Sequence, residues 1–195
     1  LDMEDSSAFG NDVSGVGNHF GTVANLAATD QTTDTCTNNF ATMNPLDNYY
    51  AGSTFSEGNC RIVTGGTPYT WNTSTFGLST GKWYMEFTII DGASGGSSLI
   101  GISDRPSTSA TAELGDHAQG YAYLSSGNFH TNNTNTSNSV SATDGDIIGI
   151  ALNLDDNEIS YYKNNVLIVA AQSITATGTG FYFPAWGDWL DGGSG

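Results

Sequence analysis

Side chains that could perform catalysis are few and widely separated in this sequence. The three histidines, His19, His117 and His130, have no Gly-x-Ser-x-Gly motif and no lone nucleophilic cysteine in a plausible position to act with them. A glycoside hydrolase on a sandwich scaffold would need two carboxylates facing each other, roughly 5 to 10 Å apart. Glu86 stands alone in its segment, and Asp91 lies beyond it in the turn. We therefore expect no enzymatic activity.

Acidic side chains gather in two turns but lack the spacing of a metal-binding loop. They are Asp144, Asp146, Asp155, Asp156 and Glu158. A calcium loop places several carboxylates on one flexible turn in a D-x-D-x-D-G pattern, whereas Asp-Asp-Asn at 155–157 is typical of a solvated hairpin turn. The two cysteines lack the paired spacing of a zinc site. We expect neither a metal nor a cofactor.

Aromatic side chains and one arginine are better candidates for binding than any residue is for catalysis. An aromatic ring offers a large contact area with a polar tip, as protein and sugar interfaces require. Trp186 and Trp189 follow the last expected strand, where an exposed loop is expected, whereas Trp83 is expected in the core. The candidate binding residues are Tyr69, Trp71, Arg105, His117, Trp186 and Trp189.

Composition narrows the class of protein and of partner. The 195 residues include 25 Gly, 9 Tyr, 9 Phe and 4 Trp but only four Lys plus Arg, which favours strands and turns over helices. The formal net charge of -16 repels phosphate backbones and anionic lipid, and the four cations are dispersed. The longest apolar run, 166–171, is far shorter than the roughly 20 residues of a membrane helix. We expect no nucleic-acid partner, no membrane insertion and an extracellular or saline setting.

Short alternating segments separated by Gly and Asn turns predict an all-β fold. The clearest is 82–90, where Trp83, Met85, Phe87 and Ile89 share one face. We expect this segment and 146–154 to be central strands in two packed antiparallel sheets. The expected strands are 53–64, 68–76, 82–90, 98–103, 119–124, 146–154, 158–163, 166–170 and 180–184. The inward side chains should be Trp83, Phe87, Ile148, Ile150 and Leu152, and 158–170 should form a hairpin across Asn164-Asn165.

Five motifs in order carry a resemblance to a known family. They are GKWYMEFTI at 81–89, LIGIS at 99–103, QGYAY at 119–123, GDIIGIALNLDDNEISYYKNN at 145–165 and FYFPAW at 181–186. Together they resemble the SPRY, or B30.2-like, domain over roughly residues 50–189. The resemblance implies a two-sheet antiparallel β-sandwich, related to concanavalin-like jelly rolls, that binds proteins through the loops at one end. It implies no catalysis and no cofactor.

The segment before the sandwich carries a second resemblance. The patterns N-D-x-S-G-x-G-N-x-F at 11–20 and D-x-x-T-N-N-F-A-T-M-N-P-L at 34–46 resemble linkers ahead of SPRY-like modules in phage tail and appendage proteins. We expect residues 1–47 to form an extended docking leader, 48–189 the sandwich and 190–195 a flexible tail. The leader should be ordered by contact, through the isolated side chains Phe9, Phe20, Leu26 and Phe40.

The same resemblance indicates a disulfide between the two cysteines as one interpretation. Similar linkers usually have proline where Cys36 stands, so Cys36 and Cys60 could have arisen together as a disulfide. Such a bridge would tie the leader to the first strand and add about 2 to 4 kcal/mol. Two unbridged, buried small residues explain the sequence equally well.

The sequence therefore predicts a non-enzymatic phage virion surface module: a tail fibre, appendage or decoration domain. It would bind other virion or surface proteins, or a host-surface protein or glycan, and it could form a homo-oligomer. The alternative is a cellular extracellular adhesin or filament subunit, and a jelly-roll glycan-active enzyme is a distant third. Recognition is expected at the loops of 69–71, 104–117, 125–137 and 184–189.

Overall fold

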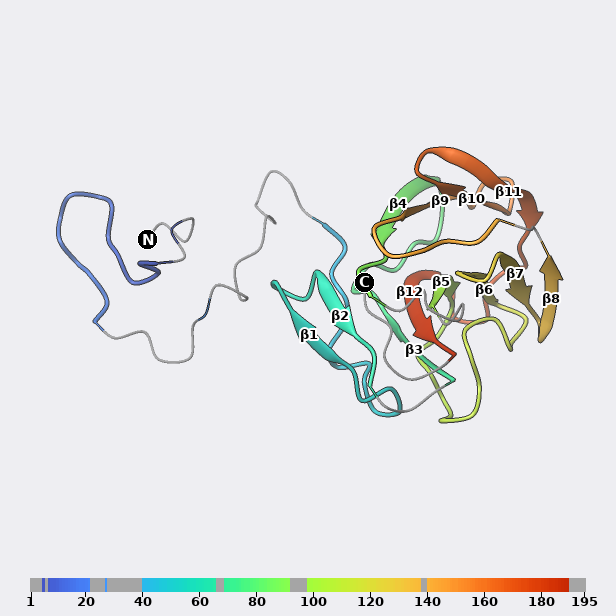
Figure 1. The fold of residues 1–195 in the computed structure, drawn as a ribbon, viewed down its shortest axis with the longest axis horizontal. Helices are drawn as coiled ribbons and strands as arrows, with labels where there is room; N and C mark the ends of the chain where they lie inside the picture. The colour runs from blue at the N-terminus through green and yellow to red at the C-terminus, as the bar shows by residue number, and fades with distance from the viewer. Residues whose placement is uncertain are drawn as a thin grey trace.

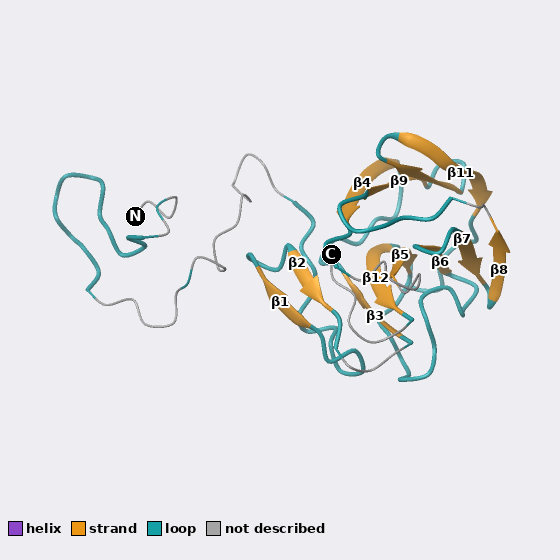
Figure 2. Ribbon diagram, viewed as in Figure 1, coloured by secondary structure: helices purple, strands orange, loops and turns teal. Residues whose placement is uncertain are grey.

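The structure, a computed structural model, describes residues 5, 7–21, 27, 40–65, 69–91, 98–137 and 140–189. Within these residues every regular element is a strand, as Figure 2 shows. No helix there is long and apolar enough to cross a membrane. The strands are β1 Thr54–Ser56, β2 Arg61–Val63, β3 Thr70–Thr73, β4 Lys82–Thr88, β5 Ser98–Ser103, β6 Gly120–Leu124, β7 Asn128–Thr131, β8 Thr134–Ser137, β9 Ile147–Asn153, β10 Glu158–Lys163, β11 Val166–Ser173 and β12 Phe183–Asp188.

Two antiparallel sheets face each other and form the sandwich. One has four strands in the order β11-β10-β9-β4, and the other has six in the order β3-β12-β5-β6-β7-β8 (Figure 1). A separate hairpin, β1-β2, lies beside β3 and contributes the buried Ile62 to the core. The expected all-β, two-sheet antiparallel sandwich is confirmed, with this hairpin as an addition.

The core lies between the two sheets and is filled from both. Strand β9 contributes Ile148, Ile150 and Leu152, whose alternation along the strand places all three on the inner face. Each is at most 1% exposed, as the sequence predicted. Trp186 of β12 lies opposite, with its ring 5.8 Å from the ring of Phe87. These contacts join the sheets into one core.

The hairpin of β10 and β11 forms where the sequence placed it. Asn164 and Asn165 have φ angles of 49° and 65°, the left-handed pair that a two-residue hairpin turn requires and that asparagine tolerates. The side chain of Asn164 also accepts a hydrogen bond from the Ile147 N–H and donates one to Asp146. The turn is thereby fixed to the start of β9.

The prediction that the strand at 82–90 is central is wrong, because β4 is an edge of the four-stranded sheet. The expectation that Trp83 is buried fails for the same reason. Trp83 points to the inner side, but no strand of the described residues lies beyond β4 to cover it, and it is 46% exposed. Its indole N–H donates to the carbonyl of Thr80 instead. Phe87, further along the strand, does pack against the core.

Two further segments differ from the sequence-based expectation. Residues 128–137, predicted as loop, form the β7–β8 hairpin around Asn132 and Asn133, at φ 48° and 55°. Residues 185–188, predicted as loop, continue the strand as part of β12, which lies between β3 and β5 in the six-stranded sheet. Trp186 is consequently 0% exposed, so the expectation that it is an exposed interface residue is wrong.

The leader is only partly within the described residues. A loop at 12–20 is held by Asp12, whose carboxylate accepts hydrogen bonds from the N–H groups of Ser14 and Asn18. The Ser14 side chain, together with these two N–H groups, lowers the pKa of Asp12 to about 2. Phe20 is 62% exposed, so it does not act as a buried anchor. Leu26 and Cys36 lie outside the described residues, and Cys60 is exposed in the β1–β2 turn. The Cys36–Cys60 disulfide therefore stays a prediction.

The leader joins the sandwich before residue 48. Met43 is 4% exposed in the core and forms an isolated antiparallel bridge with Ser74, beyond β3. Asp47 accepts hydrogen bonds from the N–H and hydroxyl of Thr73. Burial nevertheless raises the pKa of Asp47. Residues 43–47 are thus attached to the six-stranded sheet at its β3 edge.

Trp186→Ala tests whether this tryptophan is a core residue. Removing a large, fully buried ring should lower the free energy of unfolding by about 3 to 5 kcal/mol, measured by urea denaturation. Trp83→Ala is the matched control, because the same substitution at a half-exposed position removes less buried surface. Equal losses in the two variants would contradict the placement of Trp186.

Candidate binding site on the outer face of the six-stranded sheet

The long loop between β5 and β6, residues 104–119, covers the outer face of the six-stranded sheet. Its Leu114 is fully buried in a second apolar cluster with Trp71 of β3 and Leu99 of β5. Gly187 of β12 makes this approach possible, because a Cβ there would lie 2.8 Å from the Thr70 carbonyl oxygen and 3.5 Å from the Leu114 Cβ. The loop is therefore packed onto the sheet by a core of its own.

The carboxylate of Asp104 holds the first part of this loop. Its side chain is 0% exposed and accepts hydrogen bonds from Arg105 Nε at 2.7 Å and Arg105 Nη2 at 3.3 Å. The N–H of Gly178, in the loop before β12, reaches the same carboxylate at 3.3 Å. The hydroxyl of Thr179 donates to the Asp104 carbonyl. Asp104 thus ties two loops together.

Arg105 is the cation of this surface, and its guanidinium is held in place. Besides the two bonds to Asp104, Nη2 donates to Gln119 Oε1 at 3.2 Å. The Asp104 carboxylate raises the pKa of Arg105 above its ordinary value, so the group stays charged. The side chain is still 41% exposed. A fixed, charged and accessible guanidinium can bind a carboxylate or carbonyl oxygen of a partner.

His117 lies between Asp104 and the ring of Trp71. The two rings are stacked, with centroids 5.4 Å apart at 17°, while His117 Nε2 lies 3.2 Å from the hydroxyl of Ser103. Trp71 Nε1 donates to the Arg105 carbonyl. Burial lowers the pKa of His117, and the charge of Arg105 lowers it further, against the opposing effect of Asp104. His117 is therefore neutral at neutral pH and positions the loop.

Tyr69 and Trp189 lie at the neighbouring border of the same face. The N–H of Tyr69 donates to the Asp188 carbonyl, which places Tyr69 beside Trp189. Tyr69 has a φ of 62°, an unusual backbone conformation for a large side chain, and is 36% exposed. Trp189 is half-buried against the cluster of Trp71 and Leu114. Both residues therefore lie where β3 and β12 pair, next to the cluster that supports Arg105.

The structure brings five of the six candidate binding residues to one face. Arg105, Tyr69 and Trp189 present exposed or partly exposed side chains there, whereas Trp71 and His117 support them from below. Trp186 is the exception, because neighbouring residues of a strand point to opposite faces and its ring enters the core between the sheets. Its place in a binding surface is therefore excluded in this fold.

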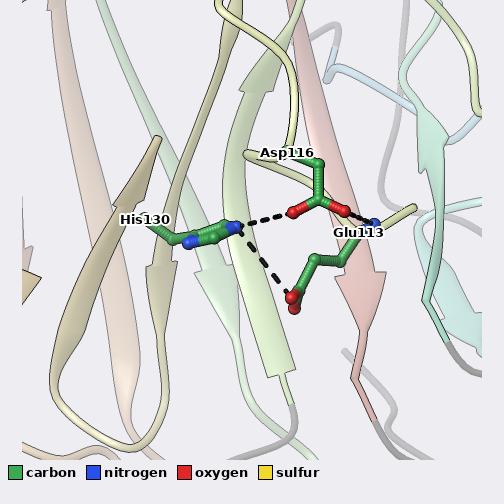
Figure 3. Close-up of side chains that lie close together, drawn as sticks. All are labelled: Glu113, Asp116 and His130. Atoms are coloured by element: carbon green, nitrogen blue, oxygen red, sulfur yellow. Dashed lines mark hydrogen bonds and ion pairs between the residues drawn. The ribbon is translucent and has the colours of Figure 1, made fainter. Parts of the chain in front are cut away.

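A cluster of Glu113, Asp116 and His130 lies on the same face and was missed in the sequence. One ligand atom from each lies within 4.8 Å of the others, and Figure 3 shows both carboxylates directed at His130 Nε2. Asp116 Oδ1 is 3.1 Å and Glu113 Oε1 is 4.0 Å from this nitrogen. Burial and the charge of Asp116 raise the pKa of Glu113, against the effect of His130.

This cluster fastens the second half of the loop to β7. Gly115 lies against the His130 ring, and a Cβ there would come within 2.3 Å of His130 Cδ2, so only glycine fits. Among the described residues these three side chains are the one group of His and carboxylates that could hold a metal ion. As they stand, His130 Nε2 is hydrogen-bonded to Asp116 and lies 4.0 Å from Glu113. The local signal was weak, because His130 belongs to a strand that the sequence did not predict.

Lowering the pH should destabilise the fold through His117. The pKa of His117 is lowered in the folded state, whereas it is about 6.5 in the unfolded chain. The unfolded state therefore binds this proton first as the pH falls below about 6.5, and the free energy of unfolding decreases. His117→Gln removes this contribution. Urea denaturation at about pH 7.5 and about pH 5.5 should show a larger loss for the native protein than for the variant; equal losses would contradict a lowered pKa.

Comparisons with known proteins match more than half of this chain. The SPRY domain family profile matches residues 82–187, more than half of the chain. The SPRY domain of human HERC1 superposes with a TM-score of 0.61 at 18% identity, covering 78% of this chain and 94% of that one. The TRIM65 PSpry domain gives 0.60 at 14% identity, covering 79% and 89%.

A third similar structure belongs to a much longer protein. Stonustoxin superposes with a TM-score of 0.60 at 20% identity over 79% of this chain but only 26% of its own. No curated protein matches the sequence. At these identities the solved structures establish the fold, and the profile match establishes the family. SPRY domains are typically protein-interaction modules. This chain, with its four- and six-stranded sandwich and its covered outer face, belongs to the SPRY-domain family.

Proposed function

We propose that this chain is a non-enzymatic binding module whose protein partner docks on the outer face of the six-stranded sheet, around Arg105. The observation that carries the proposal is the fixed guanidinium, which Asp104 and Gln119 hold while 41% of the side chain stays exposed. An ordered side chain loses little conformational entropy when a partner binds. Arginine with neighbouring aromatic rings is also the combination that dominates the energy of protein interfaces.

The other cations do not offer a comparable site. Arg61 pairs with Glu57 on the β1–β2 hairpin, Lys82 with Asp156 on the four-stranded sheet, and Lys163 with Asp146 near the start of β9. The pairs of Arg61 and Lys82 are longer, at 3.6 Å and 3.7 Å, and the side chain of Lys163 is only 25% exposed. With a formal net charge of -16, the chain attracts a partner with a basic surface. Such a partner would present one acceptor group to Arg105.

The setting that we propose is the surface of a phage particle, as part of a tail fibre, an appendage or a decoration. Its support is the leader, whose two sequence patterns at 11–20 and 34–46 resemble linkers of phage tail and appendage proteins. Residues 43–47 join the leader directly to the β3 edge of the sandwich, which suits a segment that connects the module to a larger assembly.

Selection from a displayed random-peptide library would test the proposed surface. Peptides that bind the native chain should lose affinity by about 30-fold with Arg105→Ala, because a true anchor contributes about 2 kcal/mol. Arg61→Ala is the matched control, since it removes a cation of similar exposure on the separate hairpin. The affinities are measured by isothermal titration. If Arg105→Ala and Arg61→Ala bind the selected peptides as tightly as the native chain, the recognition surface lies elsewhere.

A further inference from the structure

Strand β4 leaves one edge of the four-stranded sheet open. Among the described residues only β9 pairs with it, in a continuous register from Lys82↔Asn153 to Thr88↔Ile147 (Figure 1). Natural sandwiches usually protect such an edge with a bulge, a proline or a covering segment, because its backbone groups can pair with another strand. Strand β4 contains no proline and no irregularity in its register. The edge is therefore competent for pairing.

The backbone hydrogen bonds next to β4 show which residues face this edge. Leu154 N–H donates to the Gly81 carbonyl, and Ile89 exchanges bonds with Gly145 and Asp146 on the β9 side. In an antiparallel ladder such residues alternate with residues whose backbone groups point away. The N–H and C=O groups of Lys82, Tyr84, Glu86 and Thr88 therefore point to the open edge.

An apolar groove of about 630 Å³ runs beside this edge. It is lined by Trp83 and Met85 of β4 and by Phe40 and Phe76 from outside the strand. Trp83, Phe40 and Phe76 are each 40% to 46% exposed, which is unusual for large apolar side chains that lie together. An added strand would cover them while its backbone satisfies that of β4.

The charges of β4 indicate which strand would pair with its open edge. Lys82 and Glu86 lie on the outer face of the strand at equal distances from Tyr84. We propose that two copies of this chain pair through β4, antiparallel about a two-fold axis at Tyr84, to form one continuous eight-stranded sheet. Each Lys82 then faces Glu86 of the other copy, and each Trp83 faces Met85 of the other copy. Opposite charges and apolar pairs directly across a ladder both stabilise it.

The neighbouring register is less favourable. An axis at Met85 would place Glu86 opposite Tyr84 and Lys82 opposite Thr88, so neither charge would meet its opposite. The ion pair that Lys82 makes within its own chain, with Asp156, does not prevent the exchange. It is 3.7 Å long, and both side chains are more than 60% exposed, so Lys82 can turn toward a new partner at little cost.

The net charge gives the dimer a characteristic salt dependence. Two chains that each carry a net charge of -16 repel each other, and salt screens this long-range repulsion. The backbone hydrogen bonds and the covered apolar rings are short-range contacts, which salt affects much less. Moderate salt should therefore strengthen the dimer rather than weaken it. This response differs from that of the Arg105 surface, where the attraction of a basic partner is weakened by salt.

Light scattering coupled to size exclusion would measure the mass of the full chain over about a hundredfold range of concentration. The native chain should approach twice its 20.4 kDa mass as concentration rises. Glu86→Lys should weaken the dimer about tenfold or more, because two like-charge pairs replace two opposite-charge pairs. The double variant Lys82→Glu/Glu86→Lys restores both pairs and should return the dissociation constant to near the native value.

Glu158→Lys is the matched control, since it makes the same change of charge at an exposed position of β10 away from the edge. It should leave the dimer intact. Circular dichroism shows whether each variant is folded. A native chain that stays monomeric at all concentrations would overturn the proposal and leave the edge to another segment or protein. A dimer that responds equally to Glu86→Lys and Glu158→Lys, or that the double variant does not restore, would also overturn it.

Discussion

The buried carboxylate of Asp104 is the interaction on which the outer face of this sandwich depends. Burying a carboxylate whose side chain is 0% exposed is costly unless donors surround it, and here Arg105 and the N–H of Gly178 donate to it, while His117 Nε2 lies 3.5 Å away. These groups come from both ends of one loop and from the loop before β12. Satisfying one charge therefore fixes the β5–β6 loop, orients Arg105 and leaves part of its side chain exposed.

The rest of that loop is held by apolar packing and by contacts between carboxylates and a histidine. Leu114 is buried against Trp71, and the carboxylates of Glu113 and Asp116 both face the Nε2 atom of His130. The loop is consequently a rigid cover rather than a flexible tether, although it contains no strand or helix. The two sheets behind it provide the stable frame: their inner faces form the core, and the outer face of the larger sheet carries the loop.

The sequence predicted the elements whose patterns are local. The alternation at 147–153 and the Asn164-Asn165 turn were sufficient to predict β9 and the β10–β11 hairpin. The same Asn-Asn signal at 132–133 did not predict the β7–β8 hairpin, because the flanking strand β8 is polar and exposed and shows no alternation of apolar and polar residues. Trp83, expected in the core, is half-exposed, and Trp186, expected on the surface, is buried. Burial depends on which strand lies at the edge of a sheet. Strand order is set by contacts between segments that are distant in sequence, so the local pattern does not predict it. Asp104 and His130 required the fold itself, because their partners lie in other segments.

Hydrogen–deuterium exchange of the Asp104→Asn variant tests the central claim most directly. An asparagine of the same shape cannot neutralise Arg105, so the amides of residues 104–119 should exchange about tenfold faster or more, while those of β9 keep their native protection. Asp156→Asn, on an exposed ion pair, should change neither region. Unchanged exchange in residues 104–119 of Asp104→Asn would show that the buried carboxylate does not hold the loop.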